Sequence, residues 1–284
     1  MVRYAMVIDL TRCMGCRACV EACKVENTTR KNTFWMYVYK QEVGKYPNVN
    51  ETFLPKPCLH CNNPPCVEVC PVQATFQRED GIVLINYDHC IGCRYCVQAC
   101  PYASRYFNEH NQENSYYYDW KAEGIGVYGS GSVGDHIQEV PPFSNPDHRV
   151  TYTGRADKPG GPLMYESGGE AYSGVVTKCT FCVHRNERLK SDLLSGKAGY
   201  LSKKLSEEVA AAQRGEISID VVATRAVDIV QRLLKSMRAE GEGADEWKNL
   251  EGFEARYIPS CAANCPVDVF TFGDLSDPNS ELSR

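Results

Sequence analysis

Short hydrophobic segments next to turn residues predict several strands in this chain. Residues 74–76 and 82–85 flank the Glu-Asp-Gly sequence of residues 79–81, which is typical of a hairpin. Residues 4–9 and 270–273 are also short and apolar, and we expect them to pair although they lie near opposite ends of the sequence. The pattern therefore predicts one hairpin and one pairing of remote strands.

A helical period of hydrophobic residues runs through positions 219–237. The apolar positions are Ile219, Val222, Ala226, Ile229, Leu233 and Met237. The charged positions off that face are Asp220, Arg225, Asp228 and Arg232. We interpret the segment as a helix that packs on its own domain, with a partner-docking face as the alternative. Residues 111–175, in contrast, are rich in Tyr, Gly, Pro and Ser and predict a long irregular excursion.

Composition and charge limit the classes of protein to which this chain can belong. The 284 residues are 43% hydrophobic and 24% charged, which is typical of a globular protein. The formal charge of -5 argues against a nucleic-acid surface, which needs an excess of Lys and Arg. No stretch approaches the roughly 18 consecutive apolar residues of a membrane span. Residues 1–10 lack the pattern of a secretory signal, so we expect neither a signal nor an anchor.

Sixteen cysteines are the unusual feature of the composition. They form three compact quartets and one split quartet, with none left over. The first and third quartets have the spacing C-x2-C-x2-C-x3-C, in which the fourth cysteine ligates a different iron-sulfur cluster from the first three. The motifs must therefore work in pairs. The quartets are Cys13, Cys16, Cys19, Cys23; Cys58, Cys61, Cys66, Cys70; Cys90, Cys93, Cys96, Cys100; and Cys179, Cys182, Cys261, Cys265.

Residues beside the cysteines support cluster binding. Gly15 and Gly92 stand inside the first and third quartets, where the absence of a Cβ lets the backbone bend closely around a cluster. Pro71, Pro101 and Pro266 each follow a fourth cysteine and fix φ where the chain leaves the cluster. Disulfide frameworks are usually small and secreted, and zinc favours two separated pairs of ligands, so we consider both alternatives weaker. Structural clusters without electron traffic are a third alternative.

Internal similarity predicts how the motifs combine. Residues 6–13 align with residues 83–90, and the sequence Cys-Pro-Val occurs at 70–72 and again at 265–267. We expect an α+β fold of two nested bacterial-ferredoxin-like double-cluster units with a long irregular insertion and a helical insertion. The outer unit comprises 1–57, 176–184 and 257–284, and the inner unit comprises 58–110. The irregular insertion is 111–175, and the helical insertion is 185–256.

The rule that a fourth cysteine crosses to its partner motif gives four ligand sets as a hypothesis. Each set contains three cysteines of one motif and one of the other. The sets are Cys13, Cys16, Cys19, Cys265; Cys23, Cys179, Cys182, Cys261; Cys58, Cys61, Cys66, Cys100; and Cys70, Cys90, Cys93, Cys96. Because every set is complete, we interpret His60, between Cys58 and Cys61, as a packing or hydrogen-bonding residue.

Several cations border these cysteines, and they have two interpretations. They are Arg17, Lys24, Arg94, Lys178, His184, Arg185 and Arg188. They are either surface charges or groups that offset the negative charge of about two per oxidised cluster and so raise reduction potentials. The glycines at 124, 126 and 129 match G-x-G-x-x-G, but no strand precedes them, which argues against a dinucleotide site.

With these motifs, the chain resembles the iron-sulfur subunit of the dimethyl sulfoxide reductase family of molybdopterin oxidoreductases. The matching segments are residues 6–23, 56–71, 80–82, 89–102, 178–182, 261–266 and 273–278. The resemblance implies four 4Fe-4S clusters and a molybdopterin-containing catalytic subunit as partner. It also implies electron transfer to or from a membrane quinone-interacting subunit or another carrier, without a direct membrane span. Co-export with the catalytic partner implies the periplasmic side of the membrane, with the cytoplasm as the alternative.

We therefore expect an electron-transfer subunit without catalytic residues of its own. A catalytic cluster would need an iron that lacks a protein ligand, and no quartet is reduced to three cysteines. A free soluble polyferredoxin serving several redox partners is the alternative function.

Overall fold

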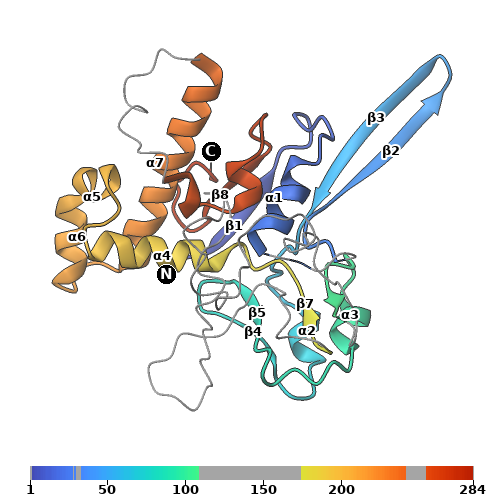
Figure 1. Cartoon of the computed structure of the whole chain (residues 1–284), viewed down its shortest axis with the longest axis horizontal. Helices are drawn as coiled ribbons and strands as arrows, with labels where there is room; N and C mark the ends of the chain where they lie inside the picture. Colours follow the sequence, from blue (N-terminus) through green and yellow to red (C-terminus); the bar gives the residue numbers. More distant parts are fainter. Residues whose placement is uncertain (1, 28, 30–32, 109–173, 241–253, 284) are drawn as a thin grey trace, which may run out of the picture.

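The computed structural model describes residues 2–27, 29, 33–108, 174–240 and 254–283 (Figure 1). Most of the irregular excursion predicted at 111–175, with the three glycines at 124, 126 and 129, lies outside these residues. The described chain combines short strands, short helices beside the cysteines and one group of longer helices. It is thus a mixed helix and strand fold, as predicted.

Two strands from remote parts of the chain form one small sheet. β1 (Tyr4–Ile8) pairs antiparallel with β8 (Phe270–Asp274), with Tyr4 opposite Asp274 and Ile8 opposite Phe270. The rings of Tyr4 and Phe272 stack with centroids 5.4 Å apart. The predicted pairing is confirmed, and it brings the cysteines that follow β1 close to those that precede β8.

The predicted hairpin is also confirmed. β4 (Thr75–Gln77) pairs antiparallel with β5 (Val83–Ile85), and Asp80 Oδ1 accepts a hydrogen bond from the Ile82 amide at 3.1 Å within the turn. The carbonyl of Asp80 accepts from the Tyr4 amide at 3.0 Å, which joins this hairpin to the β1–β8 sheet. β6 (Tyr106–Phe107) and β7 (Val176–Thr177) form a further short antiparallel pair.

A long hairpin was not predicted. β2 (Tyr37–Lys45) and β3 (Asn48–Lys56) pair along their full length and project away from the rest of the molecule (Figure 1). Only Val38 and Pro55, near the base, are buried. Because both faces are exposed over most of the length, the sequence lacks the alternation of buried and exposed residues that identifies a strand.

Four short helices stand beside the cysteines. They are α1 (Ala18–Asn27), α2 (Pro65–Glu68), α3 (Tyr95–Ala99) and α8 (Ser260–Ala263). A second group of helices follows Cys182. It comprises α4 (Val183–Leu194), α5 (Tyr200–Lys204), α6 (Ser206–Gln213) and α7 (Ile219–Glu240), with a 3-10 turn, η5 (Glu254–Tyr257), further on.

The helix predicted from the period of hydrophobic residues is α7, and it packs on its own chain as predicted. Val222 and Ala226 are fully buried, and α7 contacts α4, α6 and β8. Asp228, which the period places off the apolar face, is also buried, because β8 and the C-terminal segment cover that side of the helix. Gln231 next to it exchanges hydrogen bonds with the Phe272 backbone, at 2.5 Å and 2.8 Å.

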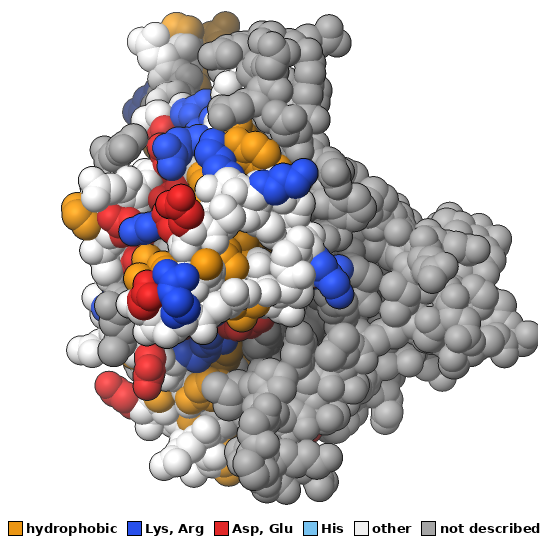
Figure 2. Space-filling view, turned by 90° about the vertical axis from the view of Figure 1, so that its left-hand side faces the viewer, with side chains coloured by type: hydrophobic (Ala, Val, Ile, Leu, Met, Phe, Trp, Pro, Cys, Tyr) orange, Lys and Arg blue, Asp and Glu red, His pale blue; other side chains and the backbone are white. Residues whose placement is uncertain are grey.

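The helical side of the molecule carries charges of both signs. Lys, Arg, Asp and Glu side chains lie close together on the described part of this face (Figure 2). Ion pairs join the helices, including Arg225 with Glu208 at 3.0 Å and Lys190 with Asp220 at 2.6 Å. Among the residues described, no helix is both long enough and apolar enough to span a lipid bilayer.

Candidate iron-sulfur sites

All four quartets begin with the same backbone conformation. In each C-x-x-C loop the residue just before the second cysteine has a positive φ, which curls the loop so that both thiols face one side. These residues are Gly15 (φ 71°), His60 (φ 45°), Gly92 (φ 68°) and Phe181 (φ 54°). Glycine adopts this conformation readily, whereas other residues pay roughly 1–2 kcal/mol for it. His60 and Phe181 must therefore contribute something that glycine cannot.

His60 and Phe181 pack against each other between the second and fourth quartets. Their ring centroids are 3.9 Å apart, and both residues are buried. His60 Nδ1 accepts a hydrogen bond from the Val83 amide at 2.9 Å, so its proton is on Nε2. Burial, followed by the charges of Lys178 and Arg105, lowers the pKa of His60 well below its usual value, and the ring is neutral. The interpretation of His60 as a packing and hydrogen-bonding residue is confirmed.

Three of the fourth cysteines share a second conformation, at the Cys-Pro turns. Cys100 Sγ accepts from the Ser104 amide and Cys265 Sγ from the Val269 amide, both at 3.4 Å and both four residues on. Cys70 receives hydrogen bonds from the backbone of residues 72, 74 and 75. The residue three positions after each cysteine has a positive φ, as found at Gln73 (52°), Ala103 (47°) and Asp268 (51°). These turns therefore aim backbone N–H groups at a thiol, and hydrogen bonds to the sulfur of this kind tune the reduction potential of a bound cluster.

Cys23 lacks the proline and lies inside α1, where the backbone amides are used by the helix. The side chain of Asn27 supplies the missing donor, because its Nδ2 reaches Cys23 Sγ at 3.5 Å and Cys182 Sγ at 4.0 Å. The position is again four residues after the cysteine. A side chain thus takes the part that a backbone amide has in the other quartets.

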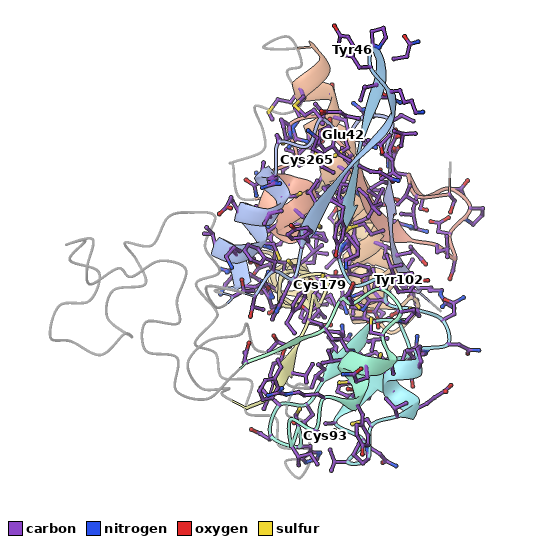
Figure 3. All side chains as sticks on the ribbon, turned by 90° about the vertical axis from the view of Figure 1, so that its right-hand side faces the viewer. Glu42, Tyr46, Cys93, Tyr102, Cys179 and Cys265 are labelled. Atoms are coloured by element: carbon purple, nitrogen blue, oxygen red, sulfur yellow. The ribbon has the colours of Figure 1, made fainter. Side chains whose placement is uncertain are left out.

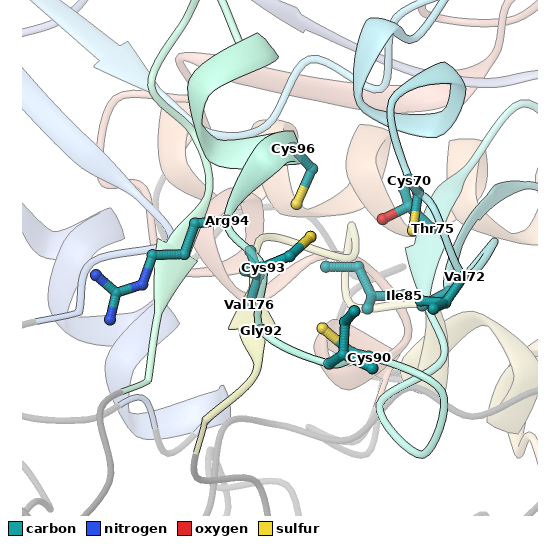
Figure 4. Close-up of a pocket in the computed structure, with 12 residues that line it drawn as sticks. Cys70, Val72, Thr75, Ile85, Cys90, Gly92, Cys93, Arg94, Cys96 and Val176 are labelled. Atoms are coloured by element: carbon teal, nitrogen blue, oxygen red, sulfur yellow. The ribbon is translucent and has the colours of Figure 1, made fainter.

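The cysteines of the first and fourth predicted sets each line a hollow. Cys70, Cys90, Cys93 and Cys96 surround one hollow together with Gly92, while Arg94 extends away from it (Figure 4). A second hollow is lined by Cys13, Cys16, Cys19 and Cys265, and Val38 and Pro55 at the base of the long hairpin also border it. Each hollow has one exposed thiol, that of Cys93 or Cys16.

The cysteines of the second set are all buried. Burial is the main cause that raises the pKa of each thiol, to about 12 for Cys179, to about 11 for Cys182 and well above the usual value for Cys23 and Cys261. The thiols also raise one another's pKa. Such thiols become thiolates only when a positive ion compensates their charge, as iron does.

The cysteines of the third set also lie close enough to influence one another's pKa. Burial raises the pKa of Cys61, and the neighbouring charges of Cys58, Cys66 and Cys100 contribute to the same shift. Across the described ranges, no three Cys, His, Asp or Glu side chains converge closely enough to hold a single metal ion. Thiols spread around a hollow instead fit the corners of an iron-sulfur cube, and soft thiolate donors favour such clusters.

The bordering cations divide into two groups. Lys24, Lys178, His184 and Arg185 are buried, so a simple surface role is wrong for these four. Lys178 Nζ donates to the Cys179 carbonyl at 2.7 Å, and burial lowers its pKa. Lys24 donates to the Thr33 carbonyl at 2.8 Å, and burial lowers its pKa to about 8. Arg17 and Arg94 are exposed, and Arg188 is half-buried.

Sequence reasoning missed Arg105. Its guanidinium is buried, with Nη2 donating to Cys66 Sγ at 3.0 Å and Nη1 donating to Thr75 Oγ1 at 3.1 Å. No local signal distinguishes this arginine, because its contact with Cys66 spans 39 positions of the sequence. Only the tertiary fold brings Arg105 and Cys66 together.

The paired cysteine motifs, the shared loop conformations and the thiol-lined hollows define a ferredoxin-type iron-sulfur protein. Two families described as 4Fe-4S dicluster domains match this chain, one over residues 12–74 and the other over residues 49–116. The first match covers the first and second quartets, and the second match covers the second and third quartets.

Three curated relatives extend the similarity beyond the cysteine motifs. The menaquinone reductase iron-sulfur cluster-binding subunit of Nitratidesulfovibrio vulgaris is 46% identical over 99% of this chain and 79% of its own length. The putative dimethyl sulfoxide reductase iron-sulfur subunit of Halobacterium salinarum is 30% identical over 100% of this chain and 71% of its own length. A selenate reductase subunit of Mesobacillus selenatarsenatis is 35% identical over 75% of this chain, which spans 64% of that relative's length.

The chain therefore belongs to the iron-sulfur subunits of the dimethyl sulfoxide reductase family of molybdopterin oxidoreductases. The resemblance inferred from the sequence motifs is confirmed at the level of the family.

Proposed function

We propose that this chain relays electrons through four 4Fe-4S clusters between a molybdopterin catalytic subunit and a membrane quinone subunit or another carrier. The observation that supports the proposal is that thiols of successive predicted sets influence one another, Cys19 with Cys23, Cys58 with Cys179 and Cys66 with Cys96. When bound, each cluster accepts and releases electrons without bond-making on a substrate. Catalysis would belong to the partner chain, because every group already has four thiols.

The four predicted ligand sets are the assignment that the thiol groups support best. The first is Cys13, Cys16, Cys19, Cys265, and the second is Cys23, Cys179, Cys182, Cys261. The third is Cys58, Cys61, Cys66, Cys100, and the fourth is Cys70, Cys90, Cys93, Cys96. The β1–β8 pairing supports an outer unit for the first two sets, and the β4–β5 hairpin supports an inner unit for the other two.

The groups have a linear order. Cys19 of the first group influences Cys23 of the second, Cys58 of the third influences Cys179, and Cys66 of the third influences Cys96 of the fourth. Cys265, Cys179 and Cys93 accordingly follow one another along the molecule (Figure 3). Exposed thiols occur only at the two ends of this order, at Cys16 and Cys93. Electrons would therefore enter and leave at the first and fourth clusters.

The similarities favour a complex over a freely diffusing carrier. The named relatives are subunits of reductases, and one is a subunit of a menaquinone reductase. We infer membrane association through such partners, on the periplasmic side if the chain is exported with its catalytic subunit. One partner would then bind near the exposed thiol of Cys16 and the other near that of Cys93.

The ligand sets are tested by pairs of cysteine variants of the anaerobically purified full chain. The wild type should contain about 16 iron atoms and matching sulfide. Cys13→Ala with Cys265→Ala removes two ligands of one cluster, so the double variant should keep about 12 iron atoms, as each single variant does. Cys261→Ala with Cys265→Ala should keep only about 8, although these cysteines are neighbours in sequence. Equal iron in the two double variants would contradict the crossed ligation.

The partner is tested by affinity purification of the tagged chain from its native host under anaerobic conditions. We expect a large subunit that contains molybdenum to be recovered with it. Recovery of an iron-replete chain alone, without molybdenum, would instead favour the polyferredoxin alternative. Iron analysis of the same sample separates this outcome from simple loss of clusters.

A further inference from the structure

Arg105 contacts the third group of cysteines and acts electrostatically on the fourth. It is 3% exposed, and its Nη2 donates to Cys66 Sγ of the third group at 3.0 Å. The charge of Arg105 also acts on Cys96 of the fourth group, where it opposes the rise that burial causes in the pKa of that thiol. A single buried guanidinium is therefore shared by thiols of two different groups.

Thr75 extends the contact to a second thiol of the fourth group. Its Oγ1 accepts from Arg105 Nη1 at 3.1 Å, which leaves its own hydroxyl proton for Cys70. Burial alone would raise the pKa of Cys70, but the hydrogen bonds from Thr75, Val72 and Ala74 lower it. Hydrogen bonds thus join Cys66, Arg105 and Thr75, and Thr75 in turn lowers the pKa of Cys70.

The chemistry of a guanidinium suits this position. It stays protonated in proteins, and its planar fork can donate to several acceptors at once. Burial opposes its charge, but the thiolates of Cys66, Cys96 and Cys58 raise its pKa further. An added electron makes a cluster and its thiolates more negative, so a fixed positive donor stabilises the reduced state more than the oxidised state.

We propose that Arg105 raises the reduction potentials of both the third and the fourth cluster. An electron is then more stable on each of these two neighbouring clusters. The inference rests on the proposed function, since it requires clusters on those two ligand sets. The step is a one-electron transfer in which one cluster is oxidised and the next is reduced. No proton moves, because the guanidinium keeps its proton throughout.

Two other cations provide contrasts. Lys178 is also buried, but its Nζ donates to the Cys179 carbonyl and the thiols that influence it are Cys58, Cys66 and Cys179, of the second and third groups. Arg94 borders the hollow of the fourth group, yet its guanidinium is 3.8 Å from the Phe107 ring centroid and the residue is exposed. Neither cation connects the third group to the fourth.

The test is an anaerobic redox titration of the full chain, with each cluster followed by electron paramagnetic resonance. In Arg105→Gln we expect the ratio of reduced to oxidised protein at a fixed potential to fall at least tenfold for both clusters, which is about 59 mV for a one-electron couple. The first and second clusters should keep their potentials. A shift of only one cluster, or of neither, would overturn the proposal.

Further variants keep the test decisive if Arg105→Gln fails to retain its clusters. Arg105→Lys keeps the charge but not the fork, and we expect smaller shifts at both clusters. Thr75→Val removes only the hydroxyl and should lower the potential of the fourth cluster alone. Equal potentials in the wild type, Arg105→Lys and Thr75→Val would overturn the proposal.

Matched controls separate this effect from a general effect of charge. Arg94→Gln should leave both potentials unchanged, and Lys178→Met should lower the second and third but not the fourth. If Arg94→Gln shifts the reduction potential of the fourth cluster as much as Arg105→Gln does, a general effect of charge explains the data, and the proposed role of Arg105 is wrong. Iron and sulfide analysis distinguishes the two proposals. A wild type without iron refutes the proposed function, whereas iron-replete variants with unchanged potentials refute only the role of Arg105.

Discussion

Glu26 and Arg185 form a doubly hydrogen-bonded ion pair between residues 159 positions apart. Arg185 Nε and Nη2 donate to the two carboxylate oxygens at 2.7 and 2.5 Å, and His184 Nε2 contacts the same carboxylate at 2.7 Å. Burial would raise the pKa of Glu26, but Arg185 and His184 lower it to about 2. The pair fastens α1 to α4 beside Cys182, whose thiol it influences.

Loss of this carboxylate should destabilise the protein strongly. Glu26→Ala leaves the guanidinium buried without its partner, which costs about 3–5 kcal/mol for pairs of this kind. The apparent unfolding temperature of the anaerobic protein, measured at one scan rate, should fall clearly. Glu216→Ala is the matched control, because Glu216 pairs with Arg214 in full exposure and its loss should change the temperature little. Similar effects of the two variants would contradict this account.

The stability contributed by Asp228 should depend on pH in a defined direction. Burial is the main cause that raises its pKa from 3.8 to about 6, and its Oδ1 has no hydrogen-bond partner among the described residues. The protonated form is favoured in the folded state, so the contribution is present below pH 3.8 and is lost as pH rises through 6. Asp228→Asn should therefore raise the apparent unfolding temperature more at about pH 8 than at about pH 5.

Asp220 on the same helix provides a control with the opposite sign. Burial would raise its pKa, but its hydrogen bond and ion pair with Lys190 lower it below 3.8. Its stabilising contribution is therefore present above pH 3.8 and is lost as pH falls below that value. Asp220→Asn should lower the unfolding temperature at about pH 8, where Asp228→Asn raises it. Changes of the same sign in both variants would contradict the assigned environments.

Substitution of Gly92 should disturb the thiol-lined hollow that it borders with Cys90 and Cys93. A Cβ there would overlap the backbone carbonyl of Gly174, which cannot rotate aside, and φ is +68°. Gly196→Ala is the matched control, because φ is +71° but no atom lies within 4 Å of the added carbon. Both variants carry a conformational cost of roughly 1–2 kcal/mol, yet only Gly92→Ala should lose iron. Full iron content in both, by metal analysis, would contradict the tight fit.

Removal of the Phe181 ring should open a cavity beside His60, between the second and fourth quartets of cysteines. The ring is 4% exposed and packs against His60, so Phe181→Ala should cost about 3–5 kcal/mol. The expected result is a lower apparent unfolding temperature and faster loss of visible absorbance in air. Tyr46→Ala, at a side chain 93% exposed on the long hairpin, should leave both measurements unchanged. If Phe181→Ala has the unfolding temperature and the rate of absorbance loss of the wild type, the ring does not contribute to stability.

Features that depend on a few neighbouring residues could be predicted from the sequence alone. The cysteine spacings, the glycines at 15 and 92 and the Cys-Pro turns fix how each loop bends, because these conformations are set within about five residues. The β4–β5 pairing also followed from the turn residues at 79–81, and the β1–β8 pairing from two short apolar segments. Family membership follows from the same local motifs.

Tertiary structure alone decided which side chains meet across the chain. Arg105 reaches Cys66, and Glu26 reaches Arg185, over sequence separations that no local pattern records. Burial of Lys24 and Lys178 could not be distinguished from surface charge, because lysines beside a cysteine look the same in sequence whichever way they point. Electrostatic interactions depend on distance and burial in three dimensions, so the charges around the thiols became definite only in the folded chain.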